Sequence, residues 1–210
     1  DLSRKQLPQF LTYDPKEIKM KIILASSSPS RRKILKNAGI DFLVKKPLIT
    51  ESREKKKYKG PQKRLALYLA EKKALSIKSQ KDTIVIGADQ VLFFQGKIFD
   101  KPRSINEAKK HLSLLSGKTH SLVCGTVITK NDRIVWKHTE ECKMTMHKLE
   151  KNYLDQYLKL TGKKVLRSVG AYTIEGYGAR LFRKVDGDFF SIVGLPLIPL
   201  LNEIRKLEKK

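Results

Sequence analysis

The feature that most constrains the fold is a short apolar run that passes through a serine-rich turn into a helical pattern. Residues 21–25 read KIILA, which is typical of a buried strand. Ser28 is suited to cap a helix that has Pro29 at its first position, and Gly39 follows the apolar helical stripe. A strand that leads directly into a helix favours an α/β fold.

Strand and helix patterns alternate along the rest of the chain. Apolar residues at helical spacing predict helices over 61–77, from the capping box at 104–107 to Gly117, over 150–160, and after 194–196. Strands are predicted over 83–88, 121–129, 133–147, 170–174, 179–185 and 189–193, with a hairpin of 91–94 and 97–99. The sequence therefore predicts an α/β fold with a mixed, curved central sheet flanked by helices. Residues 1–20 lack periodicity and are predicted to form an N-terminal extension, and residues 21–210 to form one domain.

Composition bears on location. No stretch approaches the roughly 20 apolar residues that span a bilayer, and the polar start lacks the apolar run of a secretory signal. We therefore expect no membrane association and a cytoplasmic protein. Cys124 and Cys142 are too far apart for a CxxC motif and too few for a disulfide framework, so we expect reduced structural thiols.

The charge balance points to anionic partners in general. The chain has 45 Lys+Arg against 21 Asp+Glu, a formal net charge of +24. Such a charge attracts polyanions at long range. The basic residues are spread over the whole length without a nucleic-acid recognition motif, which favours a solvated basic surface over specific nucleic-acid binding.

The turn at residues 26–32 combines hydroxyls, arginines and the free N–H groups of a helix start. Arg31 and Arg32 are able to donate bidentate hydrogen bonds to phosphoryl oxygens, and Ser26 or Ser28 to donate from a hydroxyl. This combination predicts phosphate binding. An ordinary capped helix with exposed arginines fits the local pattern equally well.

Asp89 is placed where the predicted strand 83–88 ends, and α/β folds bind ligands beyond the carboxyl ends of strands. It is predicted to bind a metal or to act as general base toward a water that attacks the α-phosphorus. A turn-forming aspartate is the alternative. The four histidines form no cluster, so a hard, oxygen-bound ion such as Mg²⁺ is preferred.

Two lysines and two glutamates complete the candidates. Lys73, on an otherwise apolar helix side, and Lys101, before Pro102, would neutralise a triphosphate and stabilise leaving pyrophosphate. In so lysine-rich a chain, the alternative for each is a surface residue. Glu51 and Glu175 are further acidic candidates, but as isolated glutamates they indicate little.

Several motifs in this order resemble the Maf-like family of nucleotide pyrophosphatases. They are IILASSSPSRRKILKNAGIDF at 22–42, LAEKKA at 69–74, GADQVL at 87–92, DKP at 100–102, LSGKTH at 115–120, and GAYTIEGYGARLF with DGDFFSIVGLPL within 170–197. The resemblance covers about residues 21–207. It implies an elongated α/β fold with a cleft between two lobes, and a hydrolase that uses Mg²⁺ or Mn²⁺ to cleave a nucleoside triphosphate into the monophosphate and pyrophosphate, clearing unwanted nucleotides.

The resemblance also implies residue roles. Asp89 corresponds to the catalytic acid, and Asp89 with Glu51 to the metal ligands. Glu175 corresponds to a position beside the base or the metal. The positions that contact substrate or phosphate correspond to Ser26, Ser28, Arg31, Glu51, Lys73 and Lys101.

The sequence departs from the family pattern in three places. Ser30 replaces the first arginine of a usual pair, and Arg167-Ser168-Val169 replaces a usual Asp-Lys-Ala. Gln90 and Glu175 are nearer to the subgroup that resembles 7-methyl-GTP pyrophosphatases than to the dTTP and UTP subgroup, but the segments SVGAYTIEG and FFSIVGLPL match neither subgroup. A modified, pyrimidine or 7-methylguanine-type nucleotide therefore stays open as the substrate. The alternatives left open are a non-catalytic nucleic-acid-binding protein linked to cell division and a nucleotide sensor without activity. A homodimer also stays open.

Overall fold

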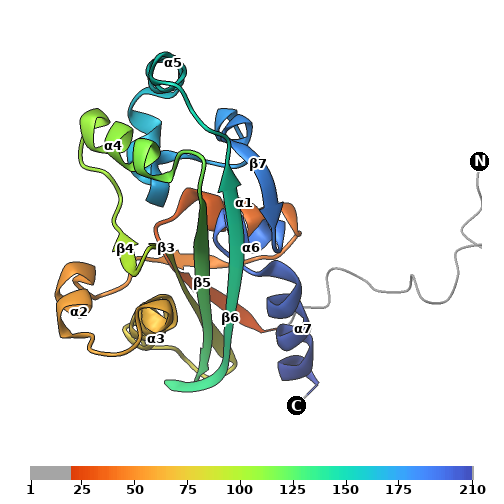
Figure 1. Ribbon diagram of the computed structural model, residues 1–210. Coiled ribbons are helices and arrows are strands. Elements are labelled where there is room, and N and C mark those ends of the chain that lie inside the picture. Colours follow the sequence, from red (N-terminus) through yellow and green to blue (C-terminus); the bar gives the residue numbers. More distant parts are fainter. Residues whose placement is uncertain (1–19, 210) are drawn as a thin grey trace, which may run out of the picture.

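A mixed seven-stranded sheet forms the centre of the computed structural model, which describes residues 20–209 (Figure 1). The predicted extension at residues 1–20 therefore lies outside the described residues, apart from Met20. The strand order is β2-β1-β3-β5-β6-β7, and β4 pairs with β3. The strands are β1 (Lys21–Ala25), β2 (Leu43–Lys45), β3 (Thr83–Phe94), β4 (Lys97–Phe99), β5 (Thr119–Lys130), β6 (Arg133–Met146) and β7 (Phe182–Asp186).

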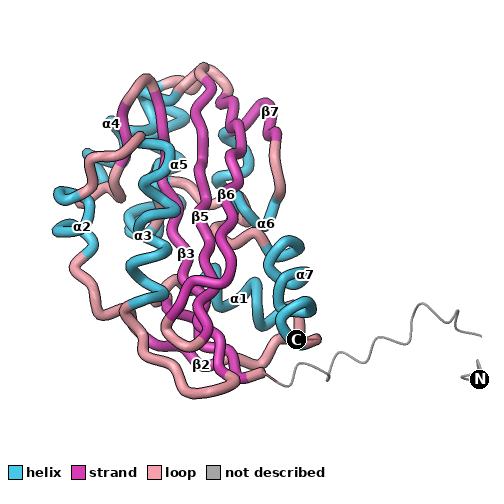
Figure 2. The backbone as a smooth tube through the Cα atoms, turned by 90° about the horizontal axis from the view of Figure 1, so that it is seen from below, coloured by secondary structure: helices cyan, strands magenta, loops and turns pink. Residues whose placement is uncertain are grey.

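Helices cover both faces of this sheet, with α2 and α3 on one side and α1, α6 and α7 on the other (Figure 2). Helices α4 and α5 lie together at one end (Figure 1). The predicted α/β fold with a mixed sheet is thus confirmed. The helices are α1 (Pro29–Asn37), α2 (Glu51–Lys57), α3 (Leu65–Leu75), α4 (Ile105–Leu115), α5 (Lys151–Thr161), α6 (Phe189–Val193) and α7 (Leu197–Glu208), and the 3₁₀ segments are Gln62–Arg64, Gly162–Arg167, Val169–Ala171 and Tyr177–Leu181.

Among the residues that the structure describes, the core contains two large apolar clusters and three smaller ones. One large cluster joins α1 and α7 to β1 and β3, through residues such as Leu35 and Ile204, neither of which is appreciably exposed. The other large cluster joins α4 and α5 to the far ends of β5 and β6, through residues such as Leu112 and Met144. Helices α1, α4 and α7 each bury apolar residues on one face, as amphipathic helices do.

Helix starts follow the predicted capping chemistry. The Ser28 hydroxyl accepts a hydrogen bond from the Arg31 backbone N–H, with Pro29 as the first helical residue. The Ser104 hydroxyl accepts from the Glu107 N–H at the start of α4. These bonds satisfy donors that a helix start otherwise leaves unpaired.

Asp89 does not end a strand, which corrects the prediction. Strand β3 runs unbroken to Phe94, because its antiparallel pairing with β5 continues as far as Phe93. Its parallel pairing with β1 stops at Gly87. Asp89 therefore lies just beyond the carboxyl end of β1, but inside β3.

Two predicted strands near the C-terminal end of the chain are wrong. Residues 170–174 begin in a 3₁₀ turn with Gly170 at φ 77°, and residues 189–193 form the helix α6. The Asp188 carboxylate caps α6 by accepting from the Ser191 N–H, so a capping bond prevails over an apolar run that suits a strand. The strand predicted over 179–185 is present only from Phe182.

The remaining expectations concern cysteines and membranes. Cys124 and Cys142 are free and buried, and burial raises the pKa of the Cys124 thiol to about 12, so it is a poor nucleophile. Within residues 20–209, none of the helices has both the length and the apolar character to traverse a bilayer.

Candidate active site

Strand alternation points Asp89 toward α3. Gly87 and Asp89 lie on the same face of β3, and Gly125 pairs directly with Asp89 on β5. A Cβ on Gly87 would meet α3 at the Ala70 carbonyl, and one on Gly125 would meet Leu67. The two glycines thus let α3 lie close to the sheet, where it brings Lys73 to Asp89.

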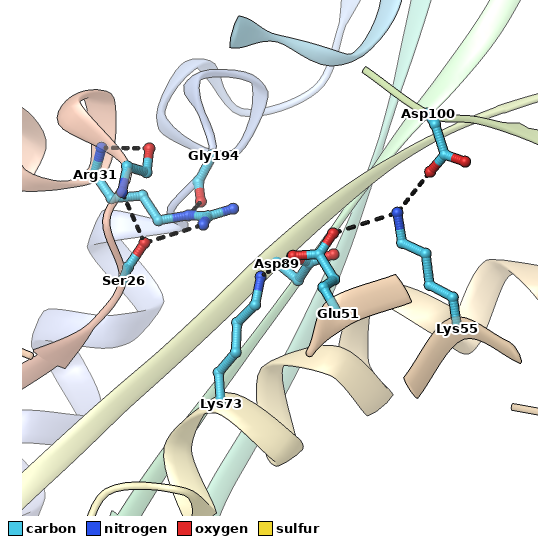
Figure 3. Close-up of polar contacts among 9 residues, drawn as sticks. Ser26, Arg31, Glu51, Lys55, Lys73, Asp89, Asp100 and Gly194 are labelled. Atoms are coloured by element: carbon cyan, nitrogen blue, oxygen red, sulfur yellow. Dashed lines mark hydrogen bonds and ion pairs between the residues drawn. The ribbon is translucent and has the colours of Figure 1, made fainter. Parts of the chain in front are cut away.

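Lys73 joins two carboxylates. Its ammonium donates to Asp89 Oδ1, and its Nζ lies 3.0 Å from Glu51 Oε2 (Figure 3). The lysine and the aspartate are nearly buried, at 8% and 5% exposed, whereas Glu51 is partly open to solvent. The lysine that the sequence marked as a polar exception on an apolar helix is therefore the centre of a buried charge cluster.

Glu51 begins α2, a helix that the sequence analysis did not predict. Partial burial would raise the pKa of its carboxyl, but the charge of Lys73, with hydrogen bonds from Lys73 and Lys55, outweighs this and lowers the pKa to about 2. The Lys55 ammonium in turn donates to Asp100 Oδ1 at 2.6 Å. Glu51 is thus ionised at neutral pH. Lys55 and Asp100 were missed in the sequence, although the i, i+4 spacing of Glu51 and Lys55 is typical of a helical ion pair.

The pKa shifts show that the candidate charges act on one another. Burial raises the pKa of Asp89 above its ordinary value, against the opposing effect of Lys73. Partial burial lowers the pKa of Lys101, and the positive charge of Arg31 lowers it further. Glu51, Lys73 and Asp89 also act on Lys101. Five candidates that are far apart in sequence therefore belong to one electrostatic cluster.

The serine-rich turn holds Arg31 from several sides. Arg31 Nε donates to the Gly194 carbonyl oxygen at 2.7 Å, and Nη1 donates to Ser26 Oγ at 3.3 Å (Figure 3). The Ser28 N–H also donates to Ser26 Oγ. Arg31 is 9% exposed, so the alternative of a capped helix with exposed arginines is wrong for this residue. It holds for Arg32, which is exposed and donates to the Ser27 carbonyl oxygen.

Glu175 is placed elsewhere. It lines a cavity of about 380 Å³ between α1 and α6, together with Phe189, Phe190 and Val193. Val193 precedes Gly194, whose carbonyl binds Arg31, so this cavity adjoins the Arg31 side of the site. The structure therefore places Glu175 at this cavity and not at the Asp89 carboxylate.

The carboxylates suit a divalent ion that takes most of its ligands from water and substrate. No group of three His, Cys, Asp or Glu side chains within residues 20–209 could hold a metal ion. Asp89 and Glu51 nevertheless both contact the Lys73 ammonium, so the two carboxylates lie close enough to each other to bind a single ion beside it. Mg²⁺ is commonly bound by one or two carboxylates plus phosphates. The donor set therefore fits such an ion.

The fold and this cluster define a class: a mixed α/β protein in which an arginine, two lysines and two carboxylates form a site suited to an anionic ligand. The sequence profile described as "Maf-like protein" matches residues 21–207, and the chain belongs to that family.

The sequence of this chain is similar to those of named relatives over most of their length. The chain is 40% identical over 190 residues to a 7-methyl-GTP pyrophosphatase of Rhizobium meliloti (strain 1021), covering 89% of this chain and 96% of that protein. It is 44% identical over 189 residues to the 7-methyl-GTP pyrophosphatase of Bartonella quintana (strain Toulouse), covering 89% and 95%. It is 39% identical over 187 residues to a nucleoside triphosphate pyrophosphatase of Hyphomonas neptunium (strain ATCC 15444), covering 88% and 94%.

Proposed function

We propose that the protein is a nucleoside triphosphate pyrophosphatase, which hydrolyses its substrate to the nucleoside monophosphate and pyrophosphate. The observation that carries this proposal is the contact of Lys73 with both Asp89 and Glu51, in a charge cluster within electrostatic reach of Lys101 and Arg31. The names of the relatives support it, because both kinds of name describe pyrophosphate release from a nucleotide.

The roles of the side chains follow from their chemistry. Asp89 is the catalytic carboxylate, and its role is to take a proton from the attacking water. Lys73, Lys101 and Arg31 offset the negative charge of the phosphates and of the departing pyrophosphate. Asp89 and Glu51 are the residues that would hold Mg²⁺ or Mn²⁺, which when bound supplies Lewis-acid stabilisation of phosphate charge.

We further propose 7-methyl-GTP, or a nucleotide with a similarly modified base, as the substrate. The relatives' names support this, and so does the cavity beside Arg31. Glu175 brings a carboxylate that is able to accept hydrogen bonds from a purine edge, and Phe189 is an exposed aromatic ring. Gln90 Nε2 donates to the Ser191 and Ile192 carbonyls, so it ties β3 to the helix α6 that carries this ring.

A cytoplasmic location is also proposed. The two buried free thiols support it, because oxidising compartments favour disulfides.

A nucleotide panel with Mg²⁺ or Mn²⁺ tests the function. We expect pyrophosphate release, fastest with 7-methyl-GTP, and we expect Asp89→Asn to lower kcat by about 100-fold or more, since it removes a general base. Nucleotide binding should be largely kept in this variant. Release of single phosphate only would contradict the proposed reaction. An Asp89→Asn variant with the wild-type rate would contradict the assigned carboxylate.

A further inference from the structure

Lys55 and Asp100 extend the Asp89–Lys73–Glu51 cluster outward. Lys55 Nζ lies 3.3 Å from Glu51 Oε1 and 2.6 Å from Asp100 Oδ1 (Figure 3). The five side chains form a continuous series of alternating charges that begins on β3 and ends at the residue after β4.

Helix α2 depends on such polar contacts for its placement. It has seven residues, all described by the structure, and none of them is buried. Apolar burial is what usually fixes a helix this short against its neighbours. Here the Tyr68 hydroxyl donates to Glu54 Oε2 at 2.8 Å, and Lys55 supplies the contacts near the site. The Lys55 side chain is 27% exposed, against 61% for Lys57 on the same helix.

The two oxygens of Glu51 have different lysine partners. Oε1 faces Lys55 at 3.3 Å and Oε2 faces Lys73 at 3.0 Å, so the carboxylate is held from both sides and its rotation is restricted. Asp100 directly precedes Lys101. The Lys55 ammonium therefore fixes both the carboxylate that reaches Lys73 and the segment that carries Lys101.

We propose that Lys55 is a positioning residue: it holds Glu51, and through Asp100 the Lys101 segment, in the arrangement that receives the divalent ion and the triphosphate. This inference rests on the proposed function. An ordinary surface ion pair is the competing interpretation, and it would leave function unchanged because such pairs contribute little.

The test compares Lys55→Met with Lys55→Arg, Asp100→Asn and the matched control Lys56→Met, which removes the same charge from an exposed neighbour. Mn²⁺ binding is measured in the presence of a non-hydrolysable α,β-methylene nucleoside triphosphate, and kcat and KM are measured in parallel. We expect Lys55→Met and Asp100→Asn to weaken Mn²⁺ binding and lower kcat by about tenfold, as loss of a partner behind a metal ligand commonly does. Lys55→Arg should keep most of the Mn²⁺ affinity and most of the kcat, and Lys56→Met should match the wild type in both quantities.

Several outcomes would overturn the inference. Equal Mn²⁺ affinity and kcat in Lys55→Met and Lys56→Met would do so, and so would a Lys55→Arg variant as defective as Lys55→Met. A crystal structure of Lys55→Met gives a readout that does not depend on activity: Glu51 should leave Lys73, and a Glu51 that stays on Lys73 would count against a positioning role. If Lys55→Met fails to fold, Asp100→Asn serves for every comparison. If the wild-type protein hydrolyses no nucleotide in the panel, the proposed function is wrong. If the wild type is active and the Lys55 variants behave like the control, only the positioning role of Lys55 is wrong.

Discussion

At the scale of single residues, Lys73 has the largest influence on the site. A lysine and an aspartate that are both nearly buried lose most of their hydration, and their mutual attraction has to offset that loss. Glu51 adds a second negative charge on the open side of the lysine. The two carboxylates therefore need the Lys73 ammonium as their partner, and replacing Lys73 should reduce the stability of the fold.

Lys73→Met should destabilise the fold by about 3–5 kcal/mol, because it leaves the buried Asp89 carboxylate without its partner. Urea unfolding at neutral pH measures this. The double variant Lys73→Met/Asp89→Asn should recover part of the loss, since both charges are then gone. A single variant within about 1 kcal/mol of the wild type would show that Asp89 is already uncharged in the folded protein.

At the scale of elements, the contact between α3 and the sheet decides where Lys73 lies. Gly87 and Gly125 leave room for the backbone of α3, and a side chain at either position would displace the helix. Asp89 pairs with Gly125 in the same ladder. Because both positions are glycine, α3 packs closely against β3 and β5, and this close packing brings Lys73 to Asp89.

Gly125→Ala should lower the free energy of unfolding by about 1–3 kcal/mol, the range for overpacked cores. It should also reduce turnover, because a shift of α3 moves Lys73. Gly176→Ala is the control, since a Cβ there would meet only Thr173 Oγ1, at 3.6 Å. Chemical denaturation and steady-state rates measure both effects. Equal stability of the two variants would contradict the close-packing argument.

Much of this arrangement could be predicted from the sequence, for identifiable reasons. The start of α1 and the long strands β5 and β6 have clear local signals: a capping serine and a proline at the first helical position for α1, a largely apolar run for β5, and alternating polar and apolar residues for much of β6. The candidates Asp89 and Lys73 had weak local signals and gained weight only from the family resemblance. Their contact depends on the pairing of distant segments, which no local pattern encodes.

Helix α2 and helix α6 show where local signals fail. The first has no buried residue and hence no apolar periodicity, so residues 51–57 gave no helical pattern. The second is a five-residue apolar run that would suit a strand equally well. Lys55 and Asp100 were missed for the same reason, because their pairing requires α2 to be in place beside β4.

At the scale of the whole molecule, the net charge of +24 gives the protein a long-range attraction for anions. A nucleoside triphosphate is strongly anionic, so this attraction favours its approach. The same charge would attract nucleic acid without specificity, which is why the nucleic-acid alternative needs a test at physiological salt.

Raising the ionic strength from about 0.02 M to about 0.3 M should raise KM for the triphosphate several-fold and leave kcat almost unchanged, since added salt screens long-range attraction more than contacts inside a buried cluster. Initial rates across a salt series measure this. Duplex DNA should compete weakly with the nucleotide near about 0.15 M salt. Tight, salt-resistant DNA binding would instead favour the nucleic-acid alternative.

The ammonium between the two carboxylates also means that the protein carries its own counter-ion. Folding then has no need of a metal, in contrast to small zinc domains that unfold when stripped. Treatment with EDTA should abolish turnover while the melting temperature stays the same, and added Mg²⁺ should restore the rate fully. If the proposed function holds, a molecule built in this way could be made, stored and purified without metal, and would become active once a divalent ion arrives with its nucleotide.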